Sequence, residues 1–488
     1  MKQIIVNVTK LDIKVAIIES GKVVEFFIQN EDVARIIGNI YIGKVANVLP
    51  GMESAFLDIG LEKNAFLYVK DLREFEEKYL DGIENSEKPI EEILNVGDEV
   101  IVQVLKEPNG TKGARVTTHY TIPGKYLVLM PNNDYIAVSK KITDSYEKDR
   151  LKKILEDIKP KGTGLIIRTA ARNKEESVFV KEIEYLVKKW KKIESDIFSS
   201  KPGSIVYKDT NVIRRVFRDM FSSEVDELII DSEEHYWELI DYVSAFSEND
   251  LKLKLKLYQK SEPILEYYGI EKEVHKALQK KVWLDCGGYL IIEKTEALIS
   301  IDVNTGKNTG CCNLDKTIFE TNYEAALEIP KQLRLRNLGG IIIIDFIDMN
   351  SEEDKEKIIE ALKFNLENDR IKTNIIGFTE LGLVEMTRKR VGRQLQAYFL
   401  DRCNECAGSG YIYSLDTIIY NMIKEIQSFF HEKDIRGLNI KVSDVLYDKI
   451  EKDYIEYIKV FGKENGKDIK FKKESSYKRE EIEIILIK

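Results

Sequence analysis

The chain has 488 residues, 43% hydrophobic and 33% charged, which is typical of a globular protein and long enough for about three domains. A net charge of −9 excludes a surface coated with basic residues for indiscriminate nucleic-acid binding, although basic residues can still gather on one face. Only four histidines are present and no two are close in sequence, which argues against a multi-histidine metal site.

The sequence contains no recognisable export or membrane signal. The N-terminal stretch lacks the apolar core and cleavage site of a signal peptide, and no apolar run approaches the ~20 residues of a membrane span. Five cysteines in so long a chain do not make a disulfide framework. We therefore expect a cytoplasmic protein with no transmembrane segment.

The first third of the chain predicts strands. Residues 1–30 predict a strand pair, DIKVAIIES and VVEFFIQN, joined by a GK turn. From 36 to 120, short alternating strands punctuated by glycine predict a small antiparallel barrel. Within it, the acidic segment 72–94 is expected to form a loop with helical turns.

The remainder predicts mixed α/β structure. The strands YLVLMP and GTGLIIRTAARN accompany polar helices over 144–159 and 174–198, and DELIIDS precedes the helical EEHYWELIDYVSAF. Buried strands follow in GGYLIIE, LISIDVN and GGIIIIDFIDM. After CNECAGSGY, a small α/β tail ends in the strand REEIEIILIK, and its basic run KFKKESSYKR is expected to be a solvated face.

Two of these strands end in an aspartate. Asp302 shares a strand face with Asn304, and Asp345 closes a run of four isoleucines that is typical of a strand covered on both faces. Sites form at the carboxyl ends of strands in α/β sheets, and two converging carboxylates there would bind Mg²⁺. Alternatively, each aspartate caps a turn, as in DVNTG. Asp348 is expected only beside such a site.

The segment CNECAGSG has the two-residue spacing of a zinc knuckle. Cys403 and Cys406 supply two of the four ligands that a structural zinc site needs, and no second pair follows nearby. A second copy of the chain could supply the other two, which predicts a zinc-linked homodimer. A redox pair and two unligated surface cysteines are the alternatives.

Two further patterns suggest contacts with nucleic acid. Phe56 and Phe66 fall on neighbouring strands of the predicted barrel, with Lys106 and Lys112 on a later hairpin, and aromatic faces beside cations bind single strands. Both rings could instead belong to the core. Arg168, beside the hydroxyl of Thr169 at the end of a strand, is suited to a phosphate.

Taken in order, these motifs resemble the ribonuclease E/G family of endoribonucleases. The blocks that carry the resemblance are YIGKVANVLPGMESAFLDIG, GKYLVLMPNN, GLIIRTA, SIDVNTG, LRLRNLGGIIIIDFIDM, GLVEMTRKR and CNECAGSG. The length resembles the compact ribonuclease G form, without a long scaffold tail.

The resemblance implies a multidomain α+β fold. An RNase H-like subdomain, residues 1–35 and 215–280, would contain an inserted S1-type OB barrel (36–120) and a 5′-sensor region (121–214). A DNase I-like α/β catalytic subdomain (281–400), a zinc-link (401–412) and a small dimerisation domain (413–488) would follow.

The resemblance also implies roles for residues. Asp302 and Asp345 would hold a catalytic Mg²⁺, assisted by Asn304. A 5′-monophosphate pocket would use Gly124, Val128, Arg168 and Thr169, and single-stranded RNA would contact Phe56, Phe66 and Lys112. Cys403 and Cys406 would be shared zinc ligands. Asn404 departs from the family, which usually has proline there, and VGRQLQ after EMTRKR is also unusual.

We therefore expect a Mg²⁺-dependent endoribonuclease that hydrolyses single-stranded, A/U-rich RNA to 5′-phosphate and 3′-hydroxyl products. A substrate 5′-monophosphate would stimulate it, and ribosomal RNA precursors and messenger RNA would be its substrates. It would act as a homodimer or tetramer. The alternatives are a non-catalytic RNA-binding protein with an S1 barrel and a zinc-linked structural oligomer.

Overall fold

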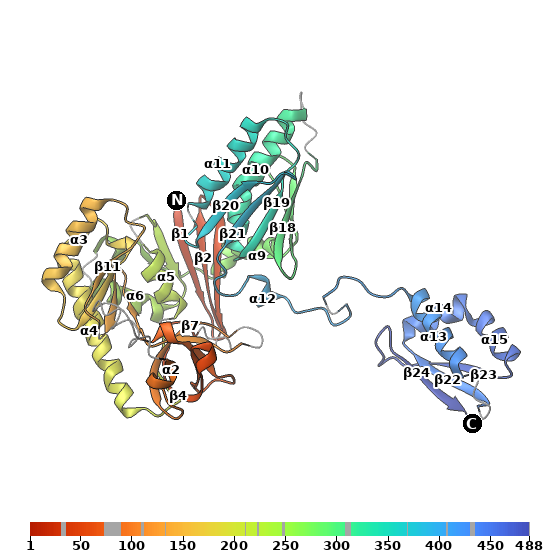
Figure 1. Ribbon diagram of the computed structural model, residues 1–488. Helices are drawn as coiled ribbons and strands as arrows, with labels where there is room; N and C mark the ends of the chain where they lie inside the picture. Colours follow the sequence, from red (N-terminus) through yellow and green to blue (C-terminus); the bar gives the residue numbers. More distant parts are fainter. Residues whose placement is uncertain are drawn as a thin grey trace. The chain divides into compact units, whose positions relative to one another are not determined.

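The computed structural model describes most of the chain: residues 1–30, 36–72, 89–108, 112–131, 133–209, 211–221, 224–245, 249–307, 314–367, 369–406, 408–429 and 435–487. These residues form two compact units, an N-terminal unit (Met1–Tyr398) and a C-terminal unit (Phe399–Lys488), both seen in Figure 1. None of the described helices combines the length and the apolar composition of a membrane span.

A five-stranded sheet with the order β15-β14-β1-β2-β3 begins the N-terminal unit. Its strands are β1 (Lys2–Val8), β2 (Asp12–Glu19), β3 (Lys22–Asn30), β14 (Glu227–Ile230) and β15 (Leu255–Leu257). The β2–β3 pair and β14 are confirmed as predicted, whereas the sequence analysis missed β1. The sheet joins the two segments for which the resemblance implies one subdomain, and its RNase H-like character stays a prediction.

Helices from the second of its chain segments pack on this sheet. They are α5 (Val212–Met220), α6 (Glu233–Ala245), α7 (Asn249–Lys252), α8 (Ile264–Tyr267) and α9 (Ile270–Ala277). One core cluster joins Ile4 and Val15 to Phe217 of α5 and Leu239 of α6. A second cluster joins Ile5 to Ile270 of α9, so the sheet is buried on both faces.

The predicted barrel is present and closed. Its strands are β4 (Ile40–Leu49), β5 (Ser54–Asp58), β6 (Ala65–Tyr68), β7 (Glu99–Lys106) and β8 (Arg115–Thr117), with β13 (Ile205–Tyr207) added beside β4. Strand β4 pairs with both β5 and β7, which closes the barrel. The β6–β8 pair is parallel, so the expectation of an antiparallel barrel was wrong in this pairing, because five strands cannot alternate direction all the way around a closed ring.

Short helical segments connect strands of the barrel. They are η2 (Pro50–Met52), η3 (Val69–Asp71) and α2 (Ile90–Ile93). Helix α2 is the part of the acidic segment 72–94 that the structure describes as helical, and residues 73–88 lie outside the described residues.

A four-stranded sheet, β11-β12-β10-β9, follows the barrel. Its elements are β9 (Ile122–Pro123), β10 (Leu127–Pro131), β11 (Ile136–Val138), β12 (Thr163–Ile167), α3 (Ser145–Ile158), η4 (Thr169–Ala171) and α4 (Glu176–Ser199). The two helices agree with the predicted ones. Helix α3 begins where the Asp144 carboxylate accepts a hydrogen bond from the Tyr146 N–H, as an N-cap does.

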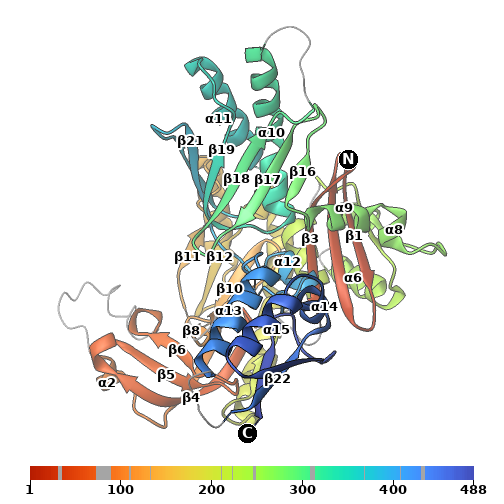
Figure 2. The ribbon, with the colours of Figure 1, turned by 90° about the vertical axis from the view of Figure 1, so that its right-hand side faces the viewer.

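A six-stranded sheet with the order β16-β17-β18-β19-β21-β20 ends the N-terminal unit. Its elements are β16 (Lys281–Trp283), β17 (Tyr289–Lys294), β18 (Leu298–Asn304), α10 (Leu314–Leu335), β19 (Gly340–Asp345), α11 (Glu352–Leu366), β20 (Thr373–Phe378) and β21 (Leu383–Arg388). Helices α10 and α11 lie together on one face of the sheet (Figure 1), and the opposite face is turned toward the viewer in Figure 2.

Burial alternates along the strands of this six-stranded sheet. In β18, Ile299, Ile301 and Val303 are buried under the helices, whereas the residues between them are partly or fully exposed. The isoleucine run of β19 follows the same rule, because Ile341 is 52% exposed. The expectation that β19 is covered on both faces was therefore wrong: in the part of the chain that the structure describes, helices pack on one face only, and we call the other the open face.

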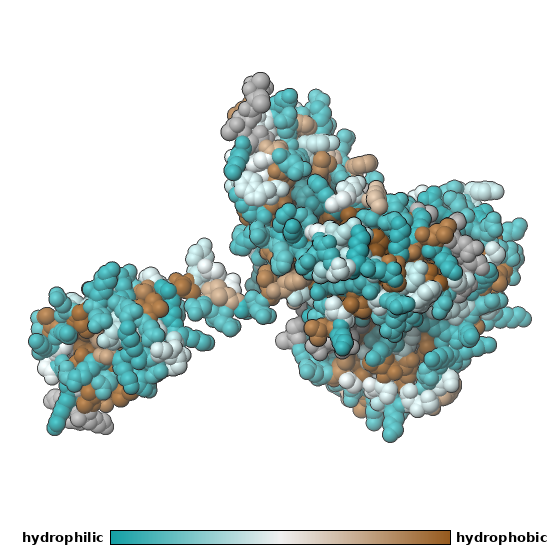
Figure 3. Space-filling view, turned by 180° about the vertical axis from the view of Figure 1, so that it is seen from behind, coloured by the Kyte–Doolittle hydropathy of each residue, from teal (hydrophilic) through white to brown (hydrophobic). Residues whose placement is uncertain are grey.

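The C-terminal unit is a small α/β domain. Helix α12 (Gln396–Phe399) spans the boundary, and the unit itself contains α13 (Leu415–Phe429), β22 (Gly437–Val442), α14 (Asp444–Asp453), α15 (Ile455–Glu464), β23 (Asp468–Lys473) and β24 (Ile482–Ile487). The predicted terminal strand is confirmed as β24. Hydrophilic side chains cover much of the face of each unit that Figure 3 shows.

Candidate functional site

The two predicted aspartates lie side by side. Strands β18 and β19 pair in parallel, and Asp302 is the register partner of Asp345. Register partners on neighbouring strands point to the same face, here the open face, and both carboxylates are exposed. The amide of Asn304 donates a hydrogen bond of 2.8 Å from Nδ2 to Oδ2 of Asp302. The structure thus brings together all three residues predicted for the metal site.

The negative charges of the carboxylates in this group repel one another. Partial burial raises the pKa of Asp345, and the neighbouring charges of Asp302 and Asp348 raise it further. Asp348 therefore acts on the pair through its charge, as expected of a residue beside the site. A divalent cation would relieve this repulsion, and Mg²⁺ commonly takes one or two carboxylates together with water and substrate phosphate. Among the described residues, no three histidine, cysteine or acidic side chains form a larger metal cluster.

Asn322 of α10 fixes the backbone next to Asp345, and the sequence analysis missed it. Its Nδ2 donates to the carbonyl oxygen of Ile347 at 2.7 Å, and its Oδ1 accepts from the Ile347 N–H at 3.0 Å. The side chain is fully buried. An asparagine at helical spacing from Ala325, Ala326 and Ile329 in an apolar stripe was the signal that could have revealed it.

The barrel residues form one row. Phe56 pairs with Phe66 across β5 and β6, with ring centroids 5.8 Å apart. Phe66 pairs with Arg115 on β8, and Arg115 pairs with Lys106 on β7. Both rings are partly exposed and lie outside the barrel core, so the alternative that they are core residues is wrong.

Arg115 was missed by the sequence analysis, and it is held by an ion pair of 2.7 Å with Asp71. Lys112 is exposed and lies three residues before Arg115. The row therefore presents two rings and a guanidinium, with lysines at its end and beside it, on the surface of the barrel.

The residues predicted to bind a phosphate also lie close together. Strands β10 and β12 pair so that Val128 is opposite Ile166, and the chain then reaches Arg168. The Arg168 guanidinium donates to the carbonyl oxygen of Gly124 and to Oδ1 of Asp219, both at 2.6 Å. The hydroxyls of Thr169 and Ser139 lie 3.2 Å apart. One carboxylate, Asp219, thus already neutralises the arginine expected to bind a phosphate.

A buried carboxylate holds the loop that carries Gly124. Glu182 of α4 accepts hydrogen bonds from the N–H groups of Tyr126 and Leu127, at 3.0 and 2.8 Å, and from that of Lys125. Burial raises the pKa of Glu182 to about 7, against the opposing effect of these donors and of Arg168. A Cβ at Gly124 would lie 2.6 Å from Oε1 of Glu182, so the loop requires glycine there. The signal was a glutamate within the buried stripe of α4.

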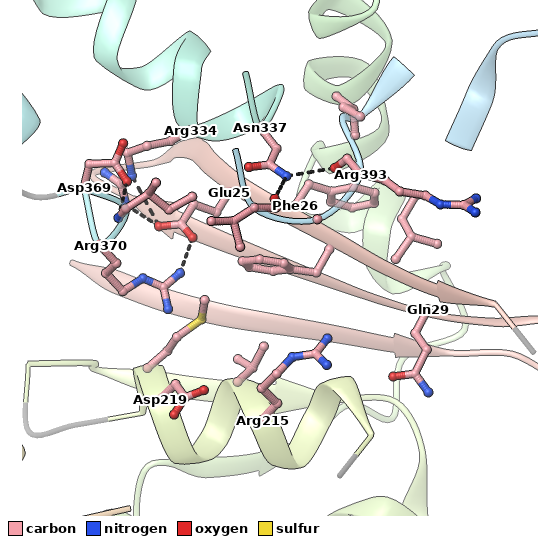
Figure 4. Close-up of a pocket in the computed structure, with 18 of the residues that line it drawn as sticks. Glu25, Phe26, Gln29, Arg215, Asp219, Arg334, Asn337, Asp369, Arg370 and Arg393 are labelled. Carbon is pink, nitrogen blue, oxygen red and sulfur yellow. Dashed lines mark hydrogen bonds and ion pairs between the residues drawn. The ribbon is translucent and has the colours of Figure 1, made fainter. Parts of the chain in front are cut away.

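A cavity of about 280 Å³ lies beside this region. Strand β3, helix α5 and the segments that follow α10 and β21 line it, and Figure 4 shows Arg215 and Arg370 on opposite walls. The carboxylate of Glu25 in β3 forms an ion pair of 2.8 Å with Arg334 of α10 and a second ion pair with Arg370. Asp219, the partner of Arg168, is also part of the wall. The cavity is therefore bordered by ion pairs that connect the five-stranded sheet to α10.

The cysteine pair lies in the C-terminal unit. Cys403 is exposed, Cys406 is half-buried, and both thiols are free of disulfide bonds. Backbone hydrogen bonds from Gly410 and Gly408, together with a side-chain hydrogen bond from Cys403, lower the pKa of Cys406, which favours the metal-binding thiolate. Gly408 and Gly410 have φ of +87° and +79°, so the tight turns expected around the pair are present.

Comparisons with known proteins identify the family of the chain. The model of the Ribonuclease E/G family matches residues 121–391. Ribonuclease G of Haemophilus influenzae is 39% identical and that of Escherichia coli is 38% identical, each over 99% of both chains. Ribonuclease E of Nostoc sp. is 40% identical over 77% of this chain and 54% of its own. The resemblance seen in the sequence is thus confirmed, and the chain belongs to the ribonuclease E/G family.

Proposed function

We propose that the protein is a metal-dependent endoribonuclease that hydrolyses single-stranded, A/U-rich RNA to 5′-phosphate and 3′-hydroxyl products. Family membership supports the ribonuclease activity. The observation that carries the metal dependence is the register pairing of Asp302 with Asp345 on an exposed sheet face, with Asn304 bonded to Asp302.

Asp302 and Asp345 would hold Mg²⁺, and Asn304 would orient Asp302 through its hydrogen bond. When bound there, Mg²⁺ supplies Lewis-acid stabilisation of charge on the scissile phosphate and lowers the pKa of a water. Nucleases that attack with the RNA's own 2′-hydroxyl generally use histidine as acid and base. The three histidines that the structure describes, His119, His235 and His275, all lie outside the six-stranded sheet, which favours hydrolysis by water.

The barrel row would bind the single strand. Stacking of bases on Phe56 and Phe66 tolerates any sequence, and Lys106 and Lys112 would neutralise backbone phosphates. This arrangement also favours the alternative function, RNA binding without chemistry. The two functions differ in whether the carboxylate pair is required.

A 5′-monophosphate would bind at Arg168 and Thr169, on the loop that contains Gly124 and beside Val128. The guanidinium and hydroxyl match phosphate oxygens, and Asp219 would have to yield its contact with Arg168 to the phosphate. We further propose that Cys403 and Cys406 share a structural Zn²⁺ with a second copy of the chain, in a homodimer or tetramer. Ribosomal RNA precursors and messenger RNA in the cytoplasm would be the substrates.

The decisive experiment incubates the purified protein with 5′-labelled single-stranded RNA, with Mg²⁺ or with a chelator, beside the variant Asp345→Asn. We expect cleavage only by the unaltered protein with Mg²⁺, and products with 5′-phosphate and 3′-hydroxyl ends. Cyclic phosphate ends would contradict hydrolysis by water. Full cleavage by Asp345→Asn would contradict the metal site, and tight binding without any cleavage would favour the non-catalytic alternative.

The 5′-sensor is tested separately. Oligonucleotides of one sequence with a 5′-monophosphate or a 5′-hydroxyl are compared, and the monophosphate form should be cleaved faster. The difference should disappear in Arg168→Gln, which removes the guanidinium. Equal rates for both forms with the unaltered protein would contradict the sensor.

A further inference from the structure

A row of aromatic residues leads from the edge of the six-stranded sheet to the carboxylate pair. Trp283 of β16 is the register partner of Tyr289 of β17, and Tyr289 is the register partner of Asn304 of β18. Register partners share one face of a sheet. Trp283 and Tyr289 therefore lie on the open face, in line with the asparagine that bonds to Asp302.

The two rings are held in a fixed arrangement. Their centroids are 5.4 Å apart with an interplanar angle of 65°, an edge-to-face contact. Gly306, with φ of +56°, turns the chain against the tyrosine, because a Cβ there would lie 2.9 Å from Cδ1 of Tyr289. Gly306 thus lies against one edge of the Tyr289 ring, which is partly buried, and Trp283, which is 52% exposed, is the more accessible ring.

Two lysines accompany the rings. The Lys281 ammonium lies 3.6 Å from the centroid of Tyr289 and 4.1 Å from that of Trp283, and the Lys307 ammonium lies 5.8 Å from that of Trp283. In a chain with a net charge of −9, an exposed indole with two neighbouring ammonium groups is a local exception. Exposed aromatic faces with neighbouring cations are the arrangement that binds single-stranded nucleic acid.

We propose that Trp283, supported by Tyr289, is a stacking platform for the base of a nucleotide next to the scissile phosphate of single-stranded RNA. Lys281 and Lys307 contact the phosphates on either side of that base. Trp283 is two strands from Asn304, about 10 Å at the usual strand spacing, which is within reach of an adjacent nucleotide. The inference rests on the proposed nuclease function, and it adds a base-binding subsite to the catalytic sheet, separate from the barrel.

The platform has a structural alternative. A cross-strand aromatic pair also stabilises a sheet, and lysines on an edge strand such as β16 discourage pairing with other chains. If this were the whole explanation, removing the indole would lower the thermal stability of the protein and leave RNA binding unchanged.

The first test measures binding of a 5′-labelled single-stranded oligonucleotide in the Asp345→Asn background, where cleavage is expected to be absent. Trp283→Ala should weaken binding roughly 5- to 160-fold, the range expected for loss of one base–aromatic stack. Trp283→Phe should retain most of the affinity. Cleavage in the background variant would refute the proposed function rather than the platform, so the two failures are distinguishable.

Trp237 provides the matched control. It is 54% exposed and has an edge-on tyrosine neighbour, Tyr236, with centroids 5.2 Å apart, but it belongs to α6 on the five-stranded sheet. Trp237→Ala should leave binding unchanged. A loss for Trp283→Ala no larger than that for Trp237→Ala would overturn the platform, as would a drop in thermal midpoint without a change in binding.

The second test locates the stacked base. A single abasic nucleotide is moved along the oligonucleotide, and binding is measured with the Asp345→Asn protein and with the double variant that also carries Trp283→Ala. At one position next to the cleavage site, the abasic change should weaken binding only to the protein that retains the tryptophan, because the double variant has already lost the partner of that base. Equal losses for both proteins at every position would overturn the platform. If Trp283→Ala does not fold, Trp283→Leu replaces it, because leucine fills part of the space but has no aromatic face, and a position-independent abasic effect still refutes the inference.

Discussion

Replacing Asp302 by asparagine tests whether this residue binds a metal ion or stabilises the folded protein. Asp302 and Asp345 are neighbours on adjacent strands, so their backbones are about 4.8 Å apart. At this separation two like charges repel by about 1 kcal/mol in a water-like dielectric and about 3 kcal/mol at an effective dielectric of 20. Because both side chains are exposed, the lower value applies, and salt reduces it further.

In the presence of a chelator and at low ionic strength, Asp302→Asn should therefore unfold at the same temperature as the unaltered protein or slightly above it. The asparagine can still accept the hydrogen bond from Asn304 through its remaining oxygen. Mg²⁺ at a hundred times its dissociation constant should stabilise the unaltered protein by ~2.7 kcal/mol. This stabilisation should vanish in Asp302→Asn together with RNA cleavage.

The assay is calorimetry with and without Mg²⁺, and cleavage is measured on the same samples. Glu293→Gln is the control, because it removes an exposed carboxylate from the same sheet, where Glu293 pairs with Lys280, and it should keep the Mg²⁺ effect. A clear loss of stability of Asp302→Asn in the chelator would show that Asp302 is a structural residue. An undiminished Mg²⁺ effect in that variant would refute metal binding by the pair.

Three further outcomes are expected. Burial raises the pKa of Glu182 to about 7, so its contribution to the free energy of unfolding is complete below about pH 4.5 and is lost as the pH rises through 7. In denaturation series between these pH values, the stability advantage of the unaltered protein over Glu182→Gln should therefore shrink. A constant difference in stability would contradict this prediction. Asn322→Ala should leave two backbone groups of Ile347 unpaired, lower stability by ~1–3 kcal/mol per group and reduce kcat more than KM, whereas an unchanged kcat would exclude a positioning role. Cys403→Ser should abolish bound zinc and halve the mass measured by light scattering, and a dimer that persists without zinc would refute the shared site.

The strand elements of the site could be predicted from local pattern. The alternation in LISIDVN assigned Asp302 and Asn304 to one face, and the structure agrees. The register that pairs Asp302 with Asp345 could not be derived locally, because α10 separates the two strands in the sequence and strand pattern alone does not fix their alignment. The isoleucine run of β19 misled the sequence analysis, since composition does not reveal that helices cover only one face.

Residues that act through the backbone were the hardest to predict. Asn322 and Glu182 are polar side chains in apolar helix stripes, and their partners are peptide groups far away in the sequence. Trp283 had no motif to mark it, because its position relative to Asn304 arises from two strand pairings. Family resemblance identified groups that are proposed to contact a ligand, whereas the groups that support them became evident only from the fold.

The ion pairs beside the cavity in Figure 4 limit how the chain can be divided. Arg334 of α10 is only 7% exposed, and its two partners, Glu19 and Glu25, belong to the first 30 residues. A fragment confined to residues 121–391, the segment that the family model matches, would lose both carboxylates together with Ile18 and Val23, which share a core cluster with Leu335 of α10. It would expose this apolar cluster to water and leave Arg334 without its anions. The smallest autonomous nuclease therefore has to retain the N-terminal hairpin, although that hairpin lies far from the carboxylate pair in the sequence.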